Sequence, residues 1–300
     1  IMGFEYLTNI PLEKAREDYL KLLTDNGFAP KTEVIPVWDA CGRVTARAVY
    51  AHICAPHYAA SAMDGVAVNA KDTFGATETT PVTLDPGQYI VLDTGDPIPE
   101  NCDAVIMVED IVKNSDGTIT IHAAAAPWQH IRQIGEDICA GEMILASHMT
   151  VAPAAIGAMI AGGVLEVEVI RKPVVGIIPT GDEIIPPCTD PKPGDILEFN
   201  GSIFSAMVRS WGAEAKVYPI VPDQFERIKA MVAKAADECD LVILNAGSSA
   251  GREDFSVKVI RELGEVLYHG IAMKPGKPAI LGRRGEKPIL GVPGYPVSGI

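Results

Sequence analysis

The sequence has few aromatic residues and few basic ones for its length. Phe, Tyr and Trp make up 6% of the 300 residues, and 25 Lys and Arg stand against 39 Asp and Glu, a formal net charge of −14. Nucleic acids and anionic membranes bind proteins through basic surfaces, and single strands stack on aromatic side chains. The composition therefore argues against a nucleic acid or a membrane as a partner.

Paired cysteines and a signal peptide are also missing. The six cysteines are scattered without a C-x-x-C pair, which fits neither a zinc site nor a dense disulfide framework and favours reduced thiols. The first residues become charged without the apolar segment of a signal peptide. The uncharged stretch from Met149 to Leu165 contains a proline and three glycines and is shorter than a membrane span. We therefore expect a buried helix there and a cytoplasmic protein.

The chain opens with a predicted helix and continues into a β-rich module. Pro11 is typical of a helix start and Asn26-Gly27 of a helix end. From Pro56 to about Cys139, short alternating apolar runs are separated by turn residues. The turn signal Asn114-Ser-Asp-Gly117 predicts a hairpin between the last two strands of the module. Its strands are expected near residues 66–68, 82–84, 89–92, 104–108 and 118–122.

After Pro173, buried apolar strands alternate with amphipathic helices. The expected helices begin near Asn200, Asp223 and Phe255. The expected strands lie near residues 174–178, 215–220, 241–244, 266–268, 279–281 and 289–292. This alternation is typical of an α/β layered domain with a mostly parallel sheet.

Three loops rich in small residues directly follow predicted strands, at residues 179–183, 245–254 and 291–298. The carboxyl ends of parallel strands gather at one edge of a sheet, where ligands bind in α/β folds. Small residues let a ligand approach backbone N–H groups, and Ser and Thr hydroxyls add donors. Any one of these segments alone is best interpreted as an ordinary loop. Three of them at one edge favour a ligand site.

Charged residues lie around these loops. Lys274 and Lys277 flank a glycine, which suits an anionic ligand. Asp182, Glu183 and Asp254 offer hard oxygen ligands for a divalent cation such as Mg²⁺. Ordinary surface lysines and solvated helix-cap carboxylates are the competing interpretations.

The β-rich module carries isolated carboxylates of its own. Asp64 lies between small residues in Ser61–Gly65, and Asp137 has Arg132 five residues upstream. Composition alone leaves open whether these carboxylates belong to turns or to a site.

Eight motifs stand in the same order as in one enzyme family. They are SAMDGVAV (61–68), TGDPIP (94–99), DAVIMVED (103–110), IRQIGEDI (131–138), IPTGDEI (178–184), NAGSSAGREDF (245–255), MKPGKPAILG (273–282) and GVPGYPVSG (291–299). Their order and wording resemble the molybdopterin molybdenumtransferases, the MoeA-type enzymes related to the C-terminal domain of gephyrin. The resemblance covers nearly the whole chain, and eight motifs in register are far more specific than any one of them.

The resemblance implies an α/β multidomain fold. A three-layer α/β/α domain with a mostly parallel sheet, the molybdopterin-binding fold, would occupy residues 173–300, and a β-rich domain residues 51–139. Residues 1–50 and 140–172 would form an elongated linker and dimerisation domain of helix and strands. Family members are homodimers whose active clefts lie between the sheet domain of one subunit and the β-rich domain of the other.

The resemblance also implies a reaction. Enzymes of this family take adenylated molybdopterin and molybdate, hydrolyse the adenylate with the help of a divalent cation such as Mg²⁺, and release molybdenum cofactor and AMP. The molybdopterin adenylyltransferase would be a further partner. Cleavage of a phosphoanhydride needs charge neutralisation more than covalent catalysis, so a cation held by carboxylates beside lysines is the expected site.

Matching motif positions carry the family's functional residues onto this chain. We expect Lys274 and Lys277 to bind phosphates, and Asp182 and Glu183 to hold the cation. The other catalytic candidates are Asp64 and Asp137, which would reach in from the partner's β-rich domain, and Asp254. The candidates for substrate binding are Thr94, Thr180, Gly181, Asp223, Gly247, Ser248, Ser249, Gly251, Pro293, Pro296 and Ser298.

Two motifs depart from the family pattern. The loop 245–251 stands where the family has Gly-Gly-Val-Ser-Val-Gly, and Tyr295 replaces the asparagine of Pro-Gly-Asn-Pro. The sequence also ends at Ile300, before the small β domain with which family members continue. We expect either a truncated chain or a different C-terminal module.

Three other functions stay open. Selectivity for tungstate rather than molybdate cannot be decided from the sequence. A scaffold or sensor would keep the fold and bind pterin or oxyanion without turnover, although the retained carboxylates and lysines weigh against it. A pterin adenylyltransferase resembles the sheet domain but lacks the β-rich module with Ser61–Gly65.

Overall fold

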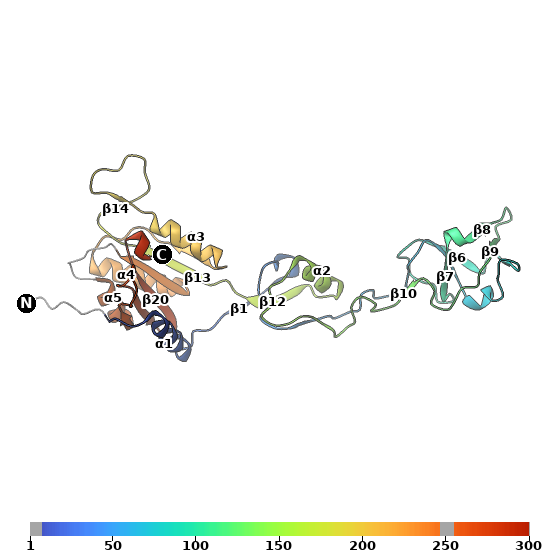
Figure 1. The fold of residues 1–300 in the computed structure, drawn as a ribbon, viewed down its shortest axis with the longest axis horizontal. Helices are drawn as coiled ribbons and strands as arrows, with labels where there is room; N and C mark the ends of the chain where they lie inside the picture. The colour runs from blue at the N-terminus through green and yellow to red at the C-terminus, as the bar shows by residue number, and fades with distance from the viewer. Residues whose placement is uncertain (1–7, 247–254, 300) are drawn as a thin grey trace, which may run out of the picture. The chain divides into compact units, whose positions relative to one another are not determined.

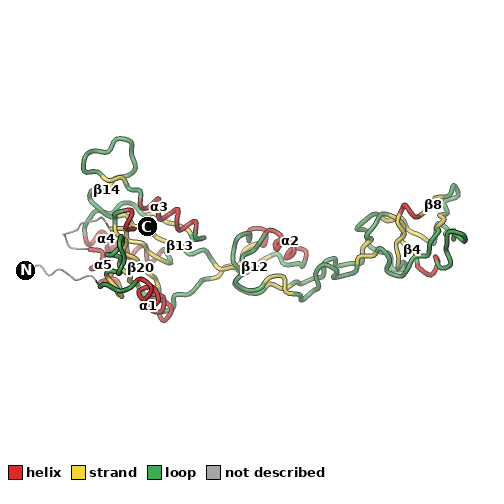
Figure 2. Tube along the Cα trace, in the orientation of Figure 1, coloured by secondary structure: helices red, strands yellow, loops and turns green. Residues whose placement is uncertain are grey.

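The computed structural model describes residues 8–246 and 255–299 and divides the chain into two compact units. The α/β unit contains residues 8–31 and 171–299, and the second unit contains Thr32–Ile170. Figure 1 labels their elements and Figure 2 colours the same trace by secondary structure. The first helix therefore belongs with the α/β unit, whereas the sequence led us to expect residues 1–50 in a linker domain.

The α/β unit is built on one six-stranded sheet. Its strands are, in spatial order, β16 (Glu214–Val217), β13 (Val174–Pro179), β17 (Leu241–Ala246), β20 (Lys287–Pro293), β19 (Ile280–Arg284) and β18 (Glu265–His269). The first four strands are parallel, and β19 and β18 add two antiparallel pairings at one side. The predicted mostly parallel sheet is confirmed.

Helices cover both faces of this sheet. Helix α3 (Asn200–Ser210) packs on one face, and helices α4 (Phe225–Glu238) and α5 (Phe255–Leu263) pack on the other (Figure 1). Side chains alternate along each strand, so Ile177 of β13 faces α3 while Ile178 faces α4 and α5. The result is the expected three-layer α/β/α arrangement.

Helix α1 (Leu12–Asp25) joins this unit through one buried face. Ala15, Tyr19 and Leu23 are buried at helical spacing, and the Tyr19 hydroxyl donates a hydrogen bond to the Gly282 carbonyl of β19. Periodicity alone could predict the helix and its apolar face but not the surface that the face would cover.

One core of the second unit lies around a strand pair. The antiparallel partners are β1 (Thr32–Pro36) and β12 (Glu166–Ile170). Helix α2 (Pro153–Ala161), the short helix η1 (Val37–Asp39) and the strands β2 (Val49–Tyr50) and β11 (Met143–Leu145) complete this part. Helix α2 lies in the uncharged stretch, but the predicted burial of this helix was wrong: Met159 alone of its residues is buried and Ile160 is 45% exposed, because the helix covers this core with one side only. In the part of the chain that the structure describes, no helix is long and apolar enough to cross a membrane.

The other core of the second unit is β-rich, as predicted. One small sheet holds β6 (Tyr89–Leu92), β4 (Gly65–Val68) and β7 (Ala104–Met107). The next holds β5 (Val82–Leu84), β9 (Ile119–Ile121) and β8 (Ile111–Lys113). A two-stranded ribbon pairs β3 (Ala60–Ser61) with β10 (Ile131–Arg132). The short helices η2 (Ala70–Thr73) and η3 (Val108–Asp110) connect strands, and buried residues of the two three-stranded sheets pack together.

The turn at residues 114–117 forms a hairpin, but with a different partner from the one expected. It joins β8 to β9, and the Asn114 N–H donates to the Thr118 carbonyl at 2.9 Å. Strand β7 pairs instead with β4 in the neighbouring sheet. The sequence prediction of a hairpin between residues 104–108 and 118–122 was wrong because η3 turns the chain after β7, so that a separate strand reaches the turn.

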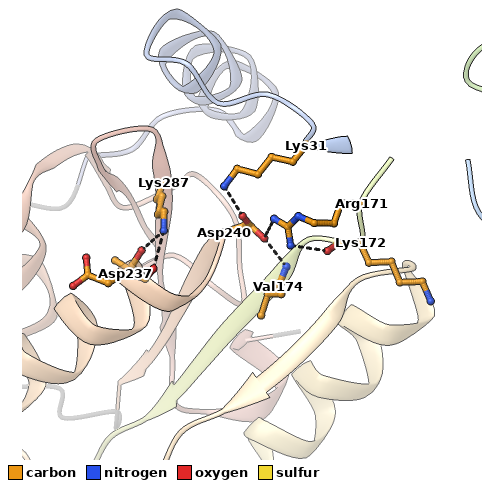
Figure 3. A network of polar contacts seen from close by, with 8 residues as sticks. Lys31, Arg171, Lys172, Val174, Asp237, Asp240 and Lys287 are labelled. Atoms are coloured by element: carbon orange, nitrogen blue, oxygen red, sulfur yellow. Dashed lines mark hydrogen bonds and ion pairs between the residues drawn. The ribbon is translucent and has the colours of Figure 1, made fainter. Parts of the chain in front are cut away.

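A single carboxylate joins the two chain segments through which the α/β unit connects to the second unit. Asp240 lies directly before β17 and accepts hydrogen bonds from Arg171 at 2.6 Å, Lys31 at 3.0 Å and the Val174 N–H at 2.9 Å (Figure 3). Burial alone would raise its pKa, but these bonds outweigh that effect and lower the pKa of Asp240 to about 2. Its side chain is only 15% exposed, so the ion pairs are poorly screened.

Asp240→Asn is therefore expected to lower the free energy of unfolding at pH 7 by about 2 kcal/mol, since the folded pKa lies below the ordinary one. This stabilisation is fully present above the ordinary pKa of 3.8 and disappears as pH falls through about 2. Urea denaturation at pH 7 and at acid pH measures both effects. Asp237→Asn is the matched control, because Asp237 is 68% exposed and pairs only with Arg284 at the surface. An equal loss in both variants would contradict the assigned role.

Candidate functional site

Three strand ends of the α/β unit meet at one edge of the sheet. β13, β17 and β20 are adjacent and parallel, with Pro179 opposite Asn245 and Ala246 opposite Pro293. Antiparallel pairing places Ile280, the first residue of β19, opposite Gly291 near the end of β20. The ends of these three parallel strands and the start of β19 are consequently at the same edge, as the sequence predicted for the three strand ends.

A pair of buried asparagines ties these strand ends together. Asn200 donates through Nδ2 to Asn245 Oδ1 at 3.0 Å and to the Gly294 carbonyl at 2.7 Å. Asn245 Nδ2 donates to the Pro293 carbonyl at 3.1 Å, and Thr180 Oγ1 donates to the Asn245 carbonyl at 3.2 Å. The Thr180 hydroxyl is thus used within the protein. The network fixes the ends of β13, β17 and β20 relative to each other.

Sequence reasoning missed this role of Asn200, which was expected only to cap a helix. The cap bond of α3 comes instead from Glu198, whose carboxylate accepts the Gly201 N–H at 2.6 Å. The sequence did contain one signal for this contact, because Asn245 is a polar residue near the end of an otherwise apolar, buried strand. Its partner, 45 residues earlier in the chain, could be found only in three dimensions.

Three carboxylates crowd together where β13 ends. The Asp223 N–H donates to Asp182 Oδ1 at 3.1 Å, and the Gly181 N–H donates to the Val221 carbonyl at 3.1 Å, so the loops after β13 and β16 run side by side. Burial raises the pKa of Asp223, and the negative charges of Asp182 and Glu183 raise it further. The predicted cation ligands and Asp223 thus form one cluster of negative charge.

Gly181 is required by the shape of this loop. Its φ is +147°, and a Cβ there would lie 2.6 Å from Ile184 Cγ1. Beside the loop opens a groove of about 580 Å³. It is lined by Pro179, Gly181, Asp182, Ile184, Pro186, Pro187, Glu198, Tyr218, Pro219, Ile220 and Pro222.

The carboxylate cluster is not by itself a complete metal cage. Within residues 8–246 and 255–299, no group of three or more His, Cys, Asp or Glu side chains is arranged to hold a metal ion. Mg²⁺ usually takes one or two protein carboxylates and completes its shell with water and substrate phosphates. Asp182 and Glu183 therefore fit a cation whose remaining ligands come from a bound substrate.

The two lysines lie in the loop between β18 and β19. The Ile271 N–H donates to the Lys277 carbonyl at 2.9 Å and closes the loop. A Cβ at Gly276 would lie 3.1 Å from the Ser298 carbonyl, so the lysine loop packs against the segment that follows β20. Lys274 is exposed and Lys277 half-buried, and neither has an ion-pair partner among the described residues. Both ammonium groups are available to an anion.

The segment after β20 turns at once into a short helix. Pro293 ends β20, Pro296 begins α6 (Pro296–Gly299), and the Ser298 N–H donates to the Tyr295 carbonyl at 2.9 Å. The side chain of Tyr295, which replaces the family's asparagine, is 62% exposed. The predicted residues Gly247, Ser248, Ser249, Gly251 and Asp254 lie outside the described residues.

In the second unit, Asp64 and Thr94 are in direct contact. Asp64 Oδ1 accepts the Thr94 N–H at 2.6 Å and the Thr94 hydroxyl at 2.7 Å, and these bonds hold the pKa of Asp64 below its ordinary value. Gly65, which follows Asp64 and begins β4, allows β7 to approach closely, because a Cβ there would lie 2.0 Å from the Ile106 carbonyl oxygen. Two residues predicted separately are thus brought together on an exposed turn.

Asp137 is held by the arginine that precedes it. Arg132 Nη2 donates to both carboxylate oxygens of Asp137, at 3.0 Å to Oδ1 and 2.7 Å to Oδ2. Because β10 pairs with β3, Ile131 stands opposite Ser61. The segments that carry Asp64 and Asp137 therefore belong to one local structure.

The three-layer α/β unit, whose sheet edge gathers acidic and basic loops, belongs to the class of α/β domains that bind ligands at the carboxyl ends of parallel strands. Residues 176–300 match the family model described as "Probable molybdopterin binding domain", and residues 10–163 match "MoeA N-terminal region (domain I and II)". The chain belongs to the MoeA family.

Relatives and solved structures agree with this membership. A putative molybdopterin biosynthesis protein of Methanocaldococcus jannaschii is 32% identical over 89% of this chain and 71% of its own length. A molybdopterin molybdenumtransferase of Haemophilus influenzae is 31% identical over 97% of this chain and 74% of its own. The crystal structure of a molybdopterin biosynthesis MoeA protein from Pyrococcus horikoshii superposes with a TM-score of 0.82 at 34% identity, covering 97% of this chain and 76% of that one.

Thr94→Val is expected to raise the pKa of Asp64, because it removes the hydroxyl donor that stabilises the carboxylate. The backbone N–H remains, so part of the lowering persists. A carboxyl NMR titration measures the shift. Thr118→Val is the matched control, since Thr118 holds Asp116 through the same two bonds, at 2.7 and 3.0 Å. Each variant should move only its own aspartate, and a change of both or neither would refute the pairing.

Asp182→Asn is expected to lower the pKa of Asp223 toward its ordinary value, because one of the two repelling charges is removed while burial stays. The same NMR titration follows the Asp223 carboxyl. Glu226→Gln serves as the control, since Glu226 is exposed on the first turn of α4 and does not contribute to the raised pKa. An unchanged Asp223 in the Asp182 variant would show that the carboxylates do not interact.

Proposed function

We propose that this protein is a molybdenumtransferase of molybdenum cofactor biosynthesis. It takes adenylated molybdopterin and molybdate, hydrolyses the adenylate, and releases molybdenum cofactor and AMP. The observation that carries the proposal is the opposition of charges at one sheet edge. Asp182, Glu183 and Asp223 lie at the ends of β13 and β16, and beside β20 lie two lysines that have no ion-pair partner in the described part of the chain. Membership of the MoeA family supports the substrate class.

The net charge of the chain makes this local arrangement necessary. With a formal charge of −14, the overall field of the protein repels molybdate and a phosphoanhydride alike. Anionic substrates must be attracted by positive groups close to where they bind. Lys274 and Lys277 supply such groups, and they would neutralise the charge that develops on the phosphates when the anhydride breaks.

A divalent cation such as Mg²⁺ fits the carboxylate cluster. The pKa of Asp223 is raised by burial and, in addition, by the negative charges of Asp182 and Glu183, which a cation would neutralise, and all the donors are hard oxygens. Asp182 and Glu183 would hold it. When bound, the cation supplies charge neutralisation and polarises phosphate oxygens. Because burial and the neighbouring negative charges raise its pKa, Asp223 holds a proton more readily than a free aspartate does, and it would be the proton carrier of this cluster.

Asp64 and Asp137 would act in the step in which molybdate reacts with the pterin. When two thiol sulfurs of the pterin bind molybdenum and one oxo group leaves as water, the two thiol protons end on that oxygen. Asp64 is held ionised by Thr94, so it orients or accepts protons rather than donating them. Asp137, clamped by Arg132, is likewise positioned rather than free to rotate. Thr94 acts as a positioning residue for Asp64.

The proposed assembly is a homodimer with shared clefts. The second unit of one subunit would present Asp64 and Asp137 to the α/β unit of the other, in the cytoplasm, where the molybdopterin adenylyltransferase would supply the adenylated substrate. The loop segments 247–251 and Asp254 would complete the pocket around the pterin and phosphates.

Release of AMP tests the activity. The protein is incubated with adenylated molybdopterin, Mg²⁺ and either molybdate or tungstate, and AMP and loaded cofactor are quantified. Lys277→Ala and Asp64→Asn are each expected to slow product formation by roughly tenfold or more, because both remove groups that face charge in the transition state. Release with only one oxyanion identifies the substrate metal, and no release by the wild type would favour a binding scaffold.

Two controls match those variants in residue type. Lys234→Ala removes an exposed lysine of α4, and Asp116→Asn removes an exposed aspartate held by a threonine. Both should keep the wild-type rate. Equal losses in the controls would mean that charge in general, and not these positions, limits the reaction.

Mixing the two inactive variants tests the shared cleft. If each site takes Asp64 from one subunit and Lys277 from the other, a mixed dimer of Asp64→Asn and Lys277→Ala has one intact site. After random subunit exchange, about a quarter of the wild-type activity should return. No recovery in exchanged, demonstrably mixed dimers would place both residues of each site in a single subunit.

A further inference from the structure

Two of the six cysteines are opposite each other in the second unit. The Ala55 N–H donates to the Ile138 carbonyl at 2.8 Å, and the Ile138 N–H donates to the Ala55 carbonyl at 3.0 Å, so these residues form an antiparallel hydrogen-bonded pair. Cys54 and Cys139 are the next residues outward on the two strands. In an antiparallel ladder the position beside a hydrogen-bonded pair is a non-hydrogen-bonded one, where the side chains lie closer together.

The two sulfurs also share one small space. A Cβ built on Gly135 would lie 3.1 Å from Cys139 Sγ and 3.5 Å from Cys54 Sγ. Gly135 has a φ of +75°, which favours glycine, and its missing side chain leaves room for both thiols. The two sulfur atoms, which belong to two different segments of the chain, therefore lie close to the same point in space.

This geometry suits a disulfide. Non-hydrogen-bonded partners have Cα atoms about 4.5 Å apart, and disulfides bridge Cα atoms about 4.4 to 6.8 Å apart. We propose that Cys54 and Cys139 are a reversible redox pair, which closes to a disulfide when it meets a small disulfide such as oxidised glutathione. The inference stands on the second unit alone and is independent of the proposed transferase activity.

Each of the two thiols makes a weak hydrogen bond, which the formation of a disulfide bond can replace. Cys54 Sγ accepts the Ala140 N–H at 3.3 Å, and Cys139 Sγ donates to the Gly135 carbonyl at 3.4 Å. A metal is a poorer occupant, since no group of three or more His, Cys, Asp or Glu side chains in the described part of the chain is arranged for one. Cys139 is exposed, so a dissolved oxidant can reach it.

The reaction balances as two thiol–disulfide exchanges. The Cys139 thiolate, having lost its proton to water, attacks oxidised glutathione, which forms a mixed disulfide and expels one glutathione thiolate. The Cys54 thiolate then attacks the Cys139 sulfur, expels the second glutathione thiolate and closes the protein disulfide. Two cysteine thiols are oxidised, one glutathione disulfide is reduced, and the two protons end on the two glutathione molecules.

The disulfide would lock a segment that carries a site candidate. The Asp137 N–H donates to the Ala55 carbonyl at 3.0 Å, so Asp137 is one residue from the strand pair that the bond would cross-link. Reduction would leave this pairing to hydrogen bonds alone. Oxidation of the two cysteines would thus make the backbone on either side of Asp137 more rigid, and reduction would make it less rigid.

Oxidation of the full chain by graded ratios of oxidised to reduced glutathione tests the proposal. Peptide mapping without reduction is expected to show a peptide pair joining Cys54 to Cys139, with a protein mass lower by two hydrogens. Exposed Cys41 and Cys188 are the internal controls, and they should carry only glutathione adducts. Dithiothreitol should restore both thiols. Protection of the Asp137 amide from hydrogen exchange should rise on oxidation.

Single variants separate a pair from two independent thiols. In Cys54→Ser, Cys139 should stop at the glutathione adduct, and it should become modified at lower oxidant than Cys54 does in Cys139→Ser. The proposal is overturned if wild-type Cys54 and Cys139 carry separate adducts, or stay unmodified, under conditions that modify Cys41 and Cys188. Because the decisive measurement uses the wild-type chain, a variant that fails to fold does not weaken it.

Discussion

The parallel pairing of β13, β17 and β20 is the constraint on which the α/β unit depends. Three neighbouring parallel strands must end at the same edge, so the loops after them are gathered whatever their sequence. The Asn200–Asn245 pair then fixes that edge, because the two amides also donate hydrogen bonds to the carbonyls of Gly294 and Pro293. Both asparagines are buried, and their Nδ2 groups and Asn245 Oδ1 are hydrogen-bonded, whereas Asn200 Oδ1 has no partner among the described residues.

The chain as a whole is strongly acidic, but its charged side chains are grouped locally. Asp182, Glu183 and Asp223 repel one another at one side of the edge, and the lysine loop lies beside β20. Elsewhere carboxylates are neutralised by partners, as Asp240 is by Arg171 and Lys31. The contrast separates the two kinds of acidic group. The paired carboxylate of Asp240 stabilises the fold, while Asp223, whose pKa is raised by burial and by two neighbouring carboxylates, is a candidate for proton transfer.

Elements with strong local patterns could be predicted well from the sequence. The strands at residues 82–84 and 89–92 and the helix Phe255–Leu263 have the predicted bounds, because alternation and helical periodicity are both local signals. Long-range pairings could not. The hairpin at residues 114–117 was paired with the wrong strand, and the strand pair β1–β12 was not predicted. Asp64 and Thr94 were both named as site residues, but only the structure shows that they touch.

From the amino-acid order alone we could predict the alternation of strands and helices, name the candidate residues by their chemistry, and recognise the order of motifs that places this chain among the MoeA proteins. Those properties are carried by residues near each other in the chain. Only the tertiary structure decided which residues meet: Asp182 with Asp223, Asn200 with Asn245, Cys54 with Cys139, and helix α1 with the sheet. Such contacts join residues tens to hundreds of positions apart, and they form only when burial of the whole core repays the entropy of closing the loops between them.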